Sequence, residues 1–186
     1  MVKQNSYGEY IFSDYPEFTP NLSPKQIFQE GAFGGTYWRE IYSSVNKKWY
    51  KNQHKKYPKS WWYGLSNNYL TLPYEEYDKT INLYGVKVGS TLEYWENSGW
   101  IEDSHPYGWM QWYCDFFIGK RSYDDKRQIC RWLKLAGPNG RFKNALINEI
   151  YRKKGKYNDY NISPAKRQTL LHWGYVLTLR DFNRKN

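Results

Sequence analysis

Three basic residues recur at helical spacing in the second half of the chain. Arg127, Arg131 and Lys134 lie three or four residues apart, between Ser122, which can cap a helix, and the helix-ending pair Gly137-Pro138. At about 100° per residue they form one stripe on the side opposite the apolar residues. A row of cations at this spacing can follow the phosphates of a nucleic-acid backbone.

A second helix, expected from residue 141 to about 154, extends this basic surface. Its apolar positions are typical of a helix with one buried face, which leaves Arg141 and Arg152 on the outer face. The two helices are joined by a Gly-Pro-Asn-Gly turn. Glycine turns before a helix occur in nucleic-acid-binding modules, although a tight turn with a purely structural role is the commoner reading.

A second basic cluster lies at 47–62, where lysines alternate with aromatic residues. We select Lys47, Lys48 and Lys51 as phosphate contacts and Trp61 and Trp62 as rings that can stack on bases. The alternative is a solvated, lysine-rich loop whose tryptophans turn inward. Both readings stay open at this point.

Candidate catalytic groups are few. Asp124 and Asp125 precede the first basic helix, and Glu102, Asp103 and His105 precede an aromatic block at 107–117. A carboxylate beside stacked aromatics is what a base-excising enzyme uses on an extruded base. Helix-start carboxylates and a loop are the structural alternative, and no nucleotide-binding or hydrolase motif accompanies these residues.

The positive charge of the chain is concentrated at one end. The 186 residues carry a net charge of +10, whereas the segment 120–186 alone has 17 Lys and Arg against 5 Asp and Glu. Such asymmetry favours an anionic polymer as partner. No long apolar run or lipidation signal favours a membrane, so we expect nucleic acid, with DNA preferred to RNA.

Cysteine and histidine usage predicts neither a disulfide framework nor a metal site. Cys114 and Cys130 are the two cysteines, and His54, His105 and His172 are too scattered for zinc spacing. We therefore expect two buried thiols, no cofactor and an intracellular location, nuclear or virus-associated.

Local signals predict a compact, mainly helical α+β domain with a few short strands. We expect an extended arm over 1–22, which packs Tyr15 and Phe18 on the body, and one globular domain over 23–180. The expected elements are a helix at 24–30 capped by Ser23, a β-like run at 83–88, a helix at 91–98 capped by Ser90, and a last helix at about 164–178. The expected core includes Trp112, Phe116, Ile129, Trp132, Leu133 and Leu146.

Five blocks of the chain resemble an aromatic-rich protein family of simple eukaryotes and large DNA viruses. The blocks are GGTYW, YGVKVG, PYGWMQWYCDFF, RQICRWLKLAGP and RQTLLHWGY. The resemblance covers 18–178 and implies a single domain, and it implies no activity and no functional residues.

The sequence therefore predicts a nucleic-acid-binding protein that uses a basic helical face and aromatic side chains. Two other classes stay open. One is a DNA-repair or base-processing enzyme of glycosylase or nuclease type, and the other is a protein-interaction or structural module. An aromatic pocket flanked by a carboxylate would favour the enzyme, and an exposed apolar patch would favour the module.

Overall fold

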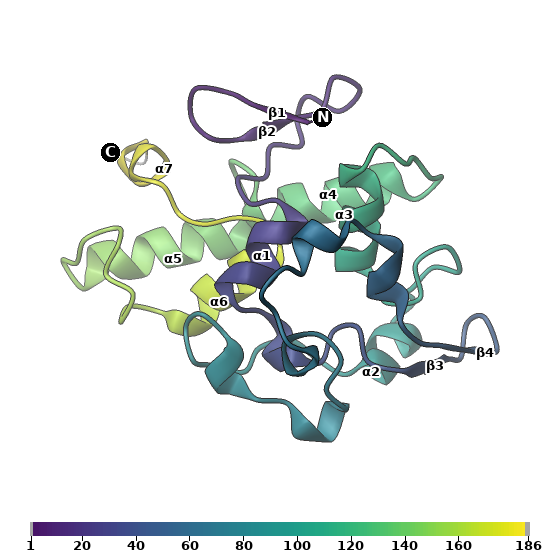
Figure 1. Cartoon of the computed structure of the whole chain (residues 1–186). Coiled ribbons are helices and arrows are strands. Elements are labelled where there is room, and N and C mark those ends of the chain that lie inside the picture. The colour runs from purple at the N-terminus through teal and green to yellow at the C-terminus, as the bar shows by residue number, and fades with distance from the viewer. Residues whose placement is uncertain (1, 185–186) are drawn as a thin grey trace.

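The computed structural model describes residues 2–184 and is mainly helical, with two small antiparallel hairpins (Figure 1). The predicted fold class is confirmed. The strands are β1 (Lys3–Gln4), β2 (Tyr10–Ile11), β3 (Ile41–Ser43) and β4 (Lys48–Tyr50). The α-helices are α1 (Pro24–Glu30), α2 (Leu92–Asn97), α3 (Trp109–Phe117), α4 (Asp125–Ala136), α5 (Arg141–Arg152), α6 (Pro164–His172) and α7 (Leu179–Asn183).

The first helix shows the most complete local signal in the chain. Ser23 Oγ accepts from the Gln26 backbone N–H, and the Gln26 side chain accepts in return from Ser23, which makes a capping box. Pro24 occupies the first turn, and Gly31 ends the helix with φ 105°. The prediction of a helix at 24–30 is therefore confirmed.

The hydrophobic core is aromatic and centres on α3. Phe18, from the N-terminal segment, is fully buried among the rings of Trp109, Trp112, Tyr113 and other core residues. The prediction that Phe18 packs on the body is thus confirmed. The predicted arm at 1–22 includes residue 1, which lies outside the described residues.

The predicted core residues are buried as expected, with one exception. Trp112, Phe116, Ile129, Trp132 and Leu146 are at most 2% exposed. Leu133 is only half-buried and packs at the edge of the core.

Helices α4 and α5 follow one another along the chain and are joined by a very short turn at 137–140 (Figure 1), and α5 also packs against α6. The turn fits because it carries glycine: a Cβ built on Gly140 would lie 2.5 Å from the backbone carbonyl carbon of Leu135. The pair places the last turn of α4 beside the first turn of α5. Basic residues at those two positions are therefore neighbours.

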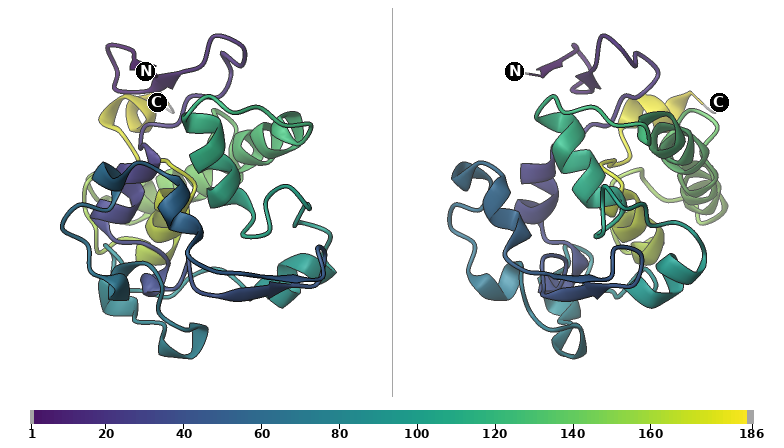
Figure 2. Two further views of the ribbon diagram at one scale, coloured as in Figure 1. Left: turned by 45° about the vertical axis from the view of Figure 1, so that its right-hand side comes forward. Right: turned by 90° about the vertical axis from the view of Figure 1, so that its right-hand side faces the viewer.

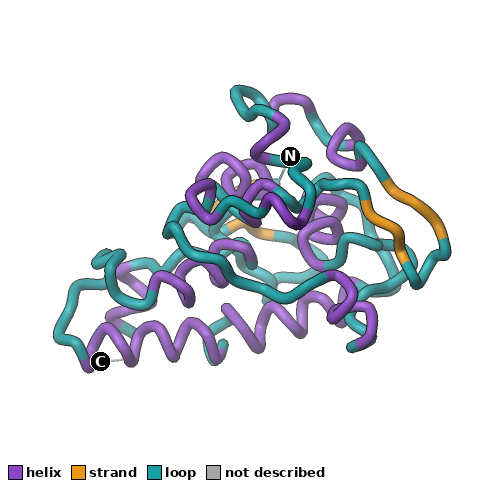
Figure 3. The backbone as a smooth tube through the Cα atoms, turned by 90° about the horizontal axis from the view of Figure 1, so that it is seen from below, coloured by secondary structure: helices purple, strands orange, loops and turns teal. Residues whose placement is uncertain are grey.

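The segment between β4 and α2 is built from loops and short 3₁₀ turns, as Figure 3 shows. The β-like run predicted at 83–88 is wrong, because this stretch is a turn. Asn82 Nδ2 donates to the Val86 carbonyl, and Gly85 adopts φ 64°, so the chain folds back on itself and pairs with no strand.

Three further sequence expectations need correction. The cap of α2 is Thr91, whose Oγ accepts from the Tyr94 N–H, and not Ser90. The last predicted helix ends at His172 because Gly174 turns the chain with φ 71°, and a separate helix, α7, follows. Cys130 is exposed, so only Cys114 is a buried thiol.

Candidate functional site

Three of the predicted basic residues meet at one large cavity. Arg131 and Lys134 from α4 and Arg141 from α5 line a cavity of about 680 Å³, because the short turn brings the two helix ends together. This volume lies within the range of roughly 300–1,000 Å³ that is typical of small-ligand sites. The opposite wall comes from 33–41, from 74–101 and from the end of α6.

The other two basic residues of the predicted face lie elsewhere. Arg127 Nε lies 2.5 Å from Asp124 Oδ1, and its Nη2 lies 3.4 Å from Glu102 Oε1, so its charge is compensated internally. Arg152 ends α5, about 16 Å along the helix axis from Arg141 at a rise of about 1.5 Å per residue. Arg127 and Arg152 therefore do not line the cavity, and a binding surface that includes all five basic residues stays a prediction.

The cavity has a buried floor and an exposed rim. Tyr37, Tyr107, Trp109 and His172 form part of the floor and are each less than a tenth exposed. The exposed rim carries Lys87, Lys134, Arg141 and Trp100. A ligand that enters therefore passes charges first and meets aromatic surface below them.

Charge inside this cavity has one sign. Five of its lining residues are basic, namely Arg39, Lys87, Arg131, Lys134 and Arg141, and no Asp or Glu of the described chain lines it. None of the five forms an ion pair with a carboxylate of residues 2–184. The site is therefore a cationic pocket whose positive charges have no carboxylate partner among residues 2–184.

Four of these cations lie over aromatic rings instead. Lys87 Nζ is 4.8 Å from the centroid of the Tyr74 ring and 4.7 Å from that of Tyr77. The Arg39 guanidinium is 5.4 Å from the Tyr74 ring, and that of Arg141 is 5.5 Å from the ring of Phe142. A ring holds a cation in place without neutralising it, so the charge stays available to an anion.

Arg131 is the most constrained of the five. Its guanidinium lies over two indoles, 5.6 Å from the Trp100 ring centroid and 5.3 Å from that of Trp173, and donates to Gln128 Oε1. Burial, with a smaller contribution from Arg127, lowers the pKa of Arg131 to about 10, so the group stays charged at neutral pH. A half-buried cation without a carboxylate is an unfavourable state that an anionic ligand relieves.

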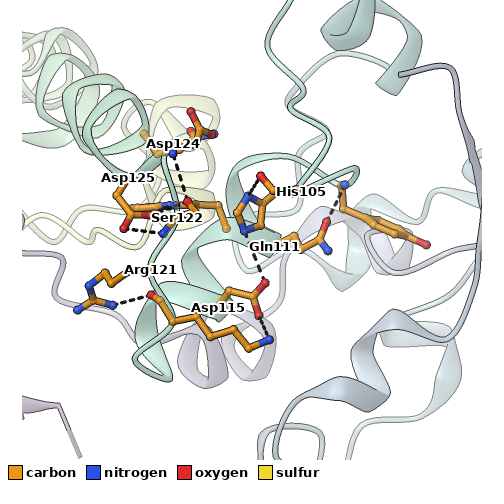
Figure 4. A network of polar contacts seen from close by, with 12 residues as sticks. His105, Gln111, Asp115, Arg121, Ser122, Asp124 and Asp125 are labelled. Carbon is orange, nitrogen blue, oxygen red and sulfur yellow. Dashed lines mark hydrogen bonds and ion pairs between the residues drawn. The ribbon is translucent and has the colours of Figure 1, made fainter. Parts of the chain in front are cut away.

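The candidate catalytic carboxylates on α4 do not face the cavity. Figure 4 shows Asp124 and Asp125 within a polar network at the start of the helix, where both accept bonds from neighbouring side chains. Asp125 accepts from Trp112 Nε1 at 2.8 Å and from Ser122 Oγ at 2.8 Å, while Arg127 and Gln128 donate to Asp124. Both residues are buried and have structural roles.

The remaining catalytic candidates are also engaged outside the cavity. Tyr123 OH donates to Asp103 at 2.6 Å and lies 3.3 Å from Glu102. His105 Nε2 lies 3.5 Å from Asp115 Oδ2, and Figure 4 shows these two side chains facing each other. The pocket thus lacks the flanking carboxylate that would favour a base-excising enzyme.

The second basic cluster divides into two parts. Lys47 and Lys48 are exposed on the β3–β4 hairpin, and Lys51 is exposed just after it. Trp61 is only 8% exposed and stacks on the buried Tyr57, so it is a core residue and not a free stacking surface. Trp62 is half-buried and donates from Nε1 to the His54 carbonyl.

The exposed ring of this cluster is one that the sequence did not single out. Trp49 on β4 is 67% exposed, and its ring contacts that of its cross-strand neighbour Tyr42, with centroids 5.5 Å apart. The hairpin lies at the edge of the molecule, beside α2 (Figures 1 and 2), and Glu96 of α2 accepts from Ser44. Since α2 also lines the cavity, the hairpin adjoins its rim.

Several cavity residues were missed because they carry no helical periodicity. Arg39, Lys87, Trp95 and Trp100 lie in loops or in a two-turn helix, and His172 follows an apolar pair on α6. Their common signal is weak: apart from Lys87, which lies between two valines, each is a ring or a cation next to a glycine or an aromatic residue. Only the tertiary fold brings them together.

No family model, curated protein or solved structure matches this chain. No helix of the described residues is long and apolar enough to cross a membrane. Among residues 2–184, no group of three or more His, Cys, Asp or Glu side chains is arranged to hold a metal ion.

Proposed function

We propose that this protein binds nucleic acid, with DNA as the first candidate, and that it seats one nucleotide of a single-stranded or locally opened strand in the cavity. The observation that carries the proposal is the pairing of five uncompensated cations with aromatic walls in a pocket without carboxylates. Phosphates match the cations, and a base matches the rings.

The two parts of a nucleotide fit the two levels of the pocket. Lys134 and Arg141 at the rim are exposed and can contact phosphates. The first turn of α5 adds backbone N–H groups, since its N-cap residue Gly140 provides no side-chain cap. At the rim, the indole of Trp100 is 40% exposed and offers a surface on which a base can stack, at about 1–3 kcal/mol per stacked base.

Entry of a base requires a strand that can expose it. A base paired in a duplex would have to leave the stack, at a cost of a few kcal/mol, whereas a single strand or a mismatch presents it at lower cost. We therefore expect single strands and mismatched duplexes to bind more tightly than a matched duplex of the same length.

The test is a salt series of binding measurements with single-stranded DNA, matched duplex, mismatched duplex and RNA. If three exposed rim cations each neutralise one phosphate, log K for a single strand falls with log salt at a slope of about −2, since each contact releases about 0.7 of a counterion. Affinity that does not respond to salt, or negligible binding at low salt, contradicts the proposal.

A matched pair of double variants locates the binding on the surface. Lys134→Ala with Arg141→Ala removes two cavity cations, and Lys126→Ala with Arg152→Ala removes two cations of the same helices outside the cavity. The first pair should flatten the slope by about 1.4 and the second should leave it close to the wild-type value. Equal effects of the two pairs would show that net charge alone drives binding.

A further inference from the structure

The floor of the cavity contains five buried side chains that can form hydrogen bonds, and four of them are already satisfied. Tyr37 OH donates to the Tyr107 carbonyl at 2.6 Å, and Tyr107 OH donates to the Arg39 carbonyl at 2.6 Å. Trp109 Nε1 donates to the His172 carbonyl at 3.2 Å, and the hydroxyl of Thr36 donates to a backbone carbonyl at 3.0 Å. The fifth side chain is the imidazole of His172, which is 6% exposed.

The tautomer of His172 follows from its neighbours. The Phe33 backbone N–H donates to His172 Nε2 at 3.0 Å, so this nitrogen is an acceptor. Gln168 Nε2 also lies 3.0 Å from His172 Nε2. The orientation of the Gln168 amide is fixed, because its Oε1 accepts from the Tyr84 N–H and its Nε2 donates to the Gly31 carbonyl. With two donors on Nε2, the ring proton is on Nδ1.

The Nδ1–H group is left without a partner. It forms no hydrogen bond with the described residues. The fully buried side-chain atoms that lack a partner do not include His172 Nδ1, so this nitrogen retains some solvent access. His172 lines the cavity, and one face of its ring is covered by Phe33, with centroids 4.0 Å apart. The cavity is therefore where Nδ1–H is accessible to a ligand.

We propose that His172 Nδ1–H donates a hydrogen bond to an acceptor atom on the edge of the seated nucleobase, which makes His172 a specificity-determining residue of the pocket. This inference rests on the proposed function. It assigns the base to the floor and the phosphate to the rim.

A neutral donor at this depth fits an uncharged acceptor better than a phosphate. Burial lowers the pKa of His172 to about 3, so the imidazole stays neutral near pH 7. A phosphate on the floor would be buried against a neutral donor while the exposed cations stayed at the rim, and an incompletely paired buried charge is costly. A base carbonyl or ring nitrogen carries no such cost, and the surrounding rings cover its faces.

The test compares two strands that differ only in acceptor atoms. One is a short oligothymidylate, and the other carries at every position a nonpolar isostere of thymine that keeps the shape and the stacking surface. The wild-type protein should bind the thymine strand about three- to tenfold more tightly, as expected for one net hydrogen bond. His172→Gln keeps an acceptor for the Phe33 N–H and removes Nδ1–H, so this variant should discriminate less by that factor.

The outcomes separate the inference from the proposed function. No salt-dependent binding of either strand overturns both. Binding in which the isostere is as tight as thymine, or in which His172→Gln discriminates as well as the wild type, overturns the role of His172 alone.

A second measurement does not depend on the folding of the variant. A nitrogen–proton NMR correlation of the histidine side chains should show the Nδ1–H tautomer for His172, with a shift of that proton when the thymine strand is added. An Nε2–H tautomer, or no shift on saturation with the strand, overturns the inference.

Discussion

His172 links the ligand site to the stability of the fold through pH. Its ordinary pKa is about 6.5. Burial lowers the pKa to about 3 in the folded protein, and no charged group contributes to the shift. The unfolded chain therefore binds a proton below about pH 6.5 that the folded protein does not bind until about pH 3. Protons favour the unfolded state in this window, so stability is lost as pH falls from 6.5 towards 3.

The magnitude follows from the same two values. pH 5 lies about 1.5 units below the pKa of the histidine in the unfolded chain. Protonation of that chain therefore lowers the unfolding free energy by about 2 kcal/mol relative to pH 7.5, at about 1.4 kcal/mol per unit. Other groups add their own contributions, including His54, whose pKa burial also lowers. A variant without the imidazole isolates the part that belongs to His172.

The assay is urea denaturation of wild type and His172→Gln at pH 7.5 and pH 5, followed by tryptophan fluorescence. The unfolding free energy of the wild type should fall by about 2 kcal/mol more than that of the variant between the two pH values. His54 is present in both proteins and cancels in the comparison. An identical pH dependence of the two proteins would show that His172 is not held neutral, and the argument for its tautomer would fail with it.

Three further predictions concern single side chains. Trp132→Ala should cost about 3–5 kcal/mol of unfolding free energy, because the ring is fully buried and its Nε1 donates to the Trp173 carbonyl; a near-native denaturation midpoint would refute this. Trp49→Ala should weaken binding of single strands with an unchanged salt slope and a stability change below about 1 kcal/mol, since the ring is exposed on the hairpin; a flattened slope would contradict a stacking role. Gly34→Ala should cost more than about 1 kcal/mol, because the added Cβ would lie 2.4 Å from the Tyr77 ring at a φ of 54°. Gly64→Ala is the control, because Gly64 also has a positive φ but has open space around it. Equal losses of unfolding free energy in the two variants would show that the contact with Tyr77 does not contribute.

The elements with strong local signals were predictable from the sequence. Ser23 and Gly31 mark the two ends of α1, and the apolar periodicity around Trp132 identifies α4 and its buried face. The sequence also predicts that Lys134 and Arg141 lie close together, because a four-residue turn between two helices must bring the end of the first next to the start of the second.

The cavity itself could not be predicted, for two physical reasons. Its walls come from loops and short turns, whose shape depends on tertiary contacts such as that of Asn82 with Gly34 and not on periodicity. The sequence also does not determine which way a single side chain in such segments points. Trp61 is buried in the core and Trp49 is exposed to solvent, although both have lysines nearby in the sequence. Arg127 appears as part of a basic stripe until the fold places Glu102 and Asp124 beside it.

Photo-crosslinking tests the seating of a base in the cavity most directly. A single strand that carries iododeoxyuridine is irradiated with the protein at low salt, and the attached residues are identified by mass spectrometry. The aromatic residues that line the pocket, above all the exposed Trp100, should carry the crosslinks, and the Lys134→Ala, Arg141→Ala double variant should lose most of them. Crosslinks confined to Trp49 or to other surfaces outside the cavity, under conditions in which the strand is bound, would contradict the account.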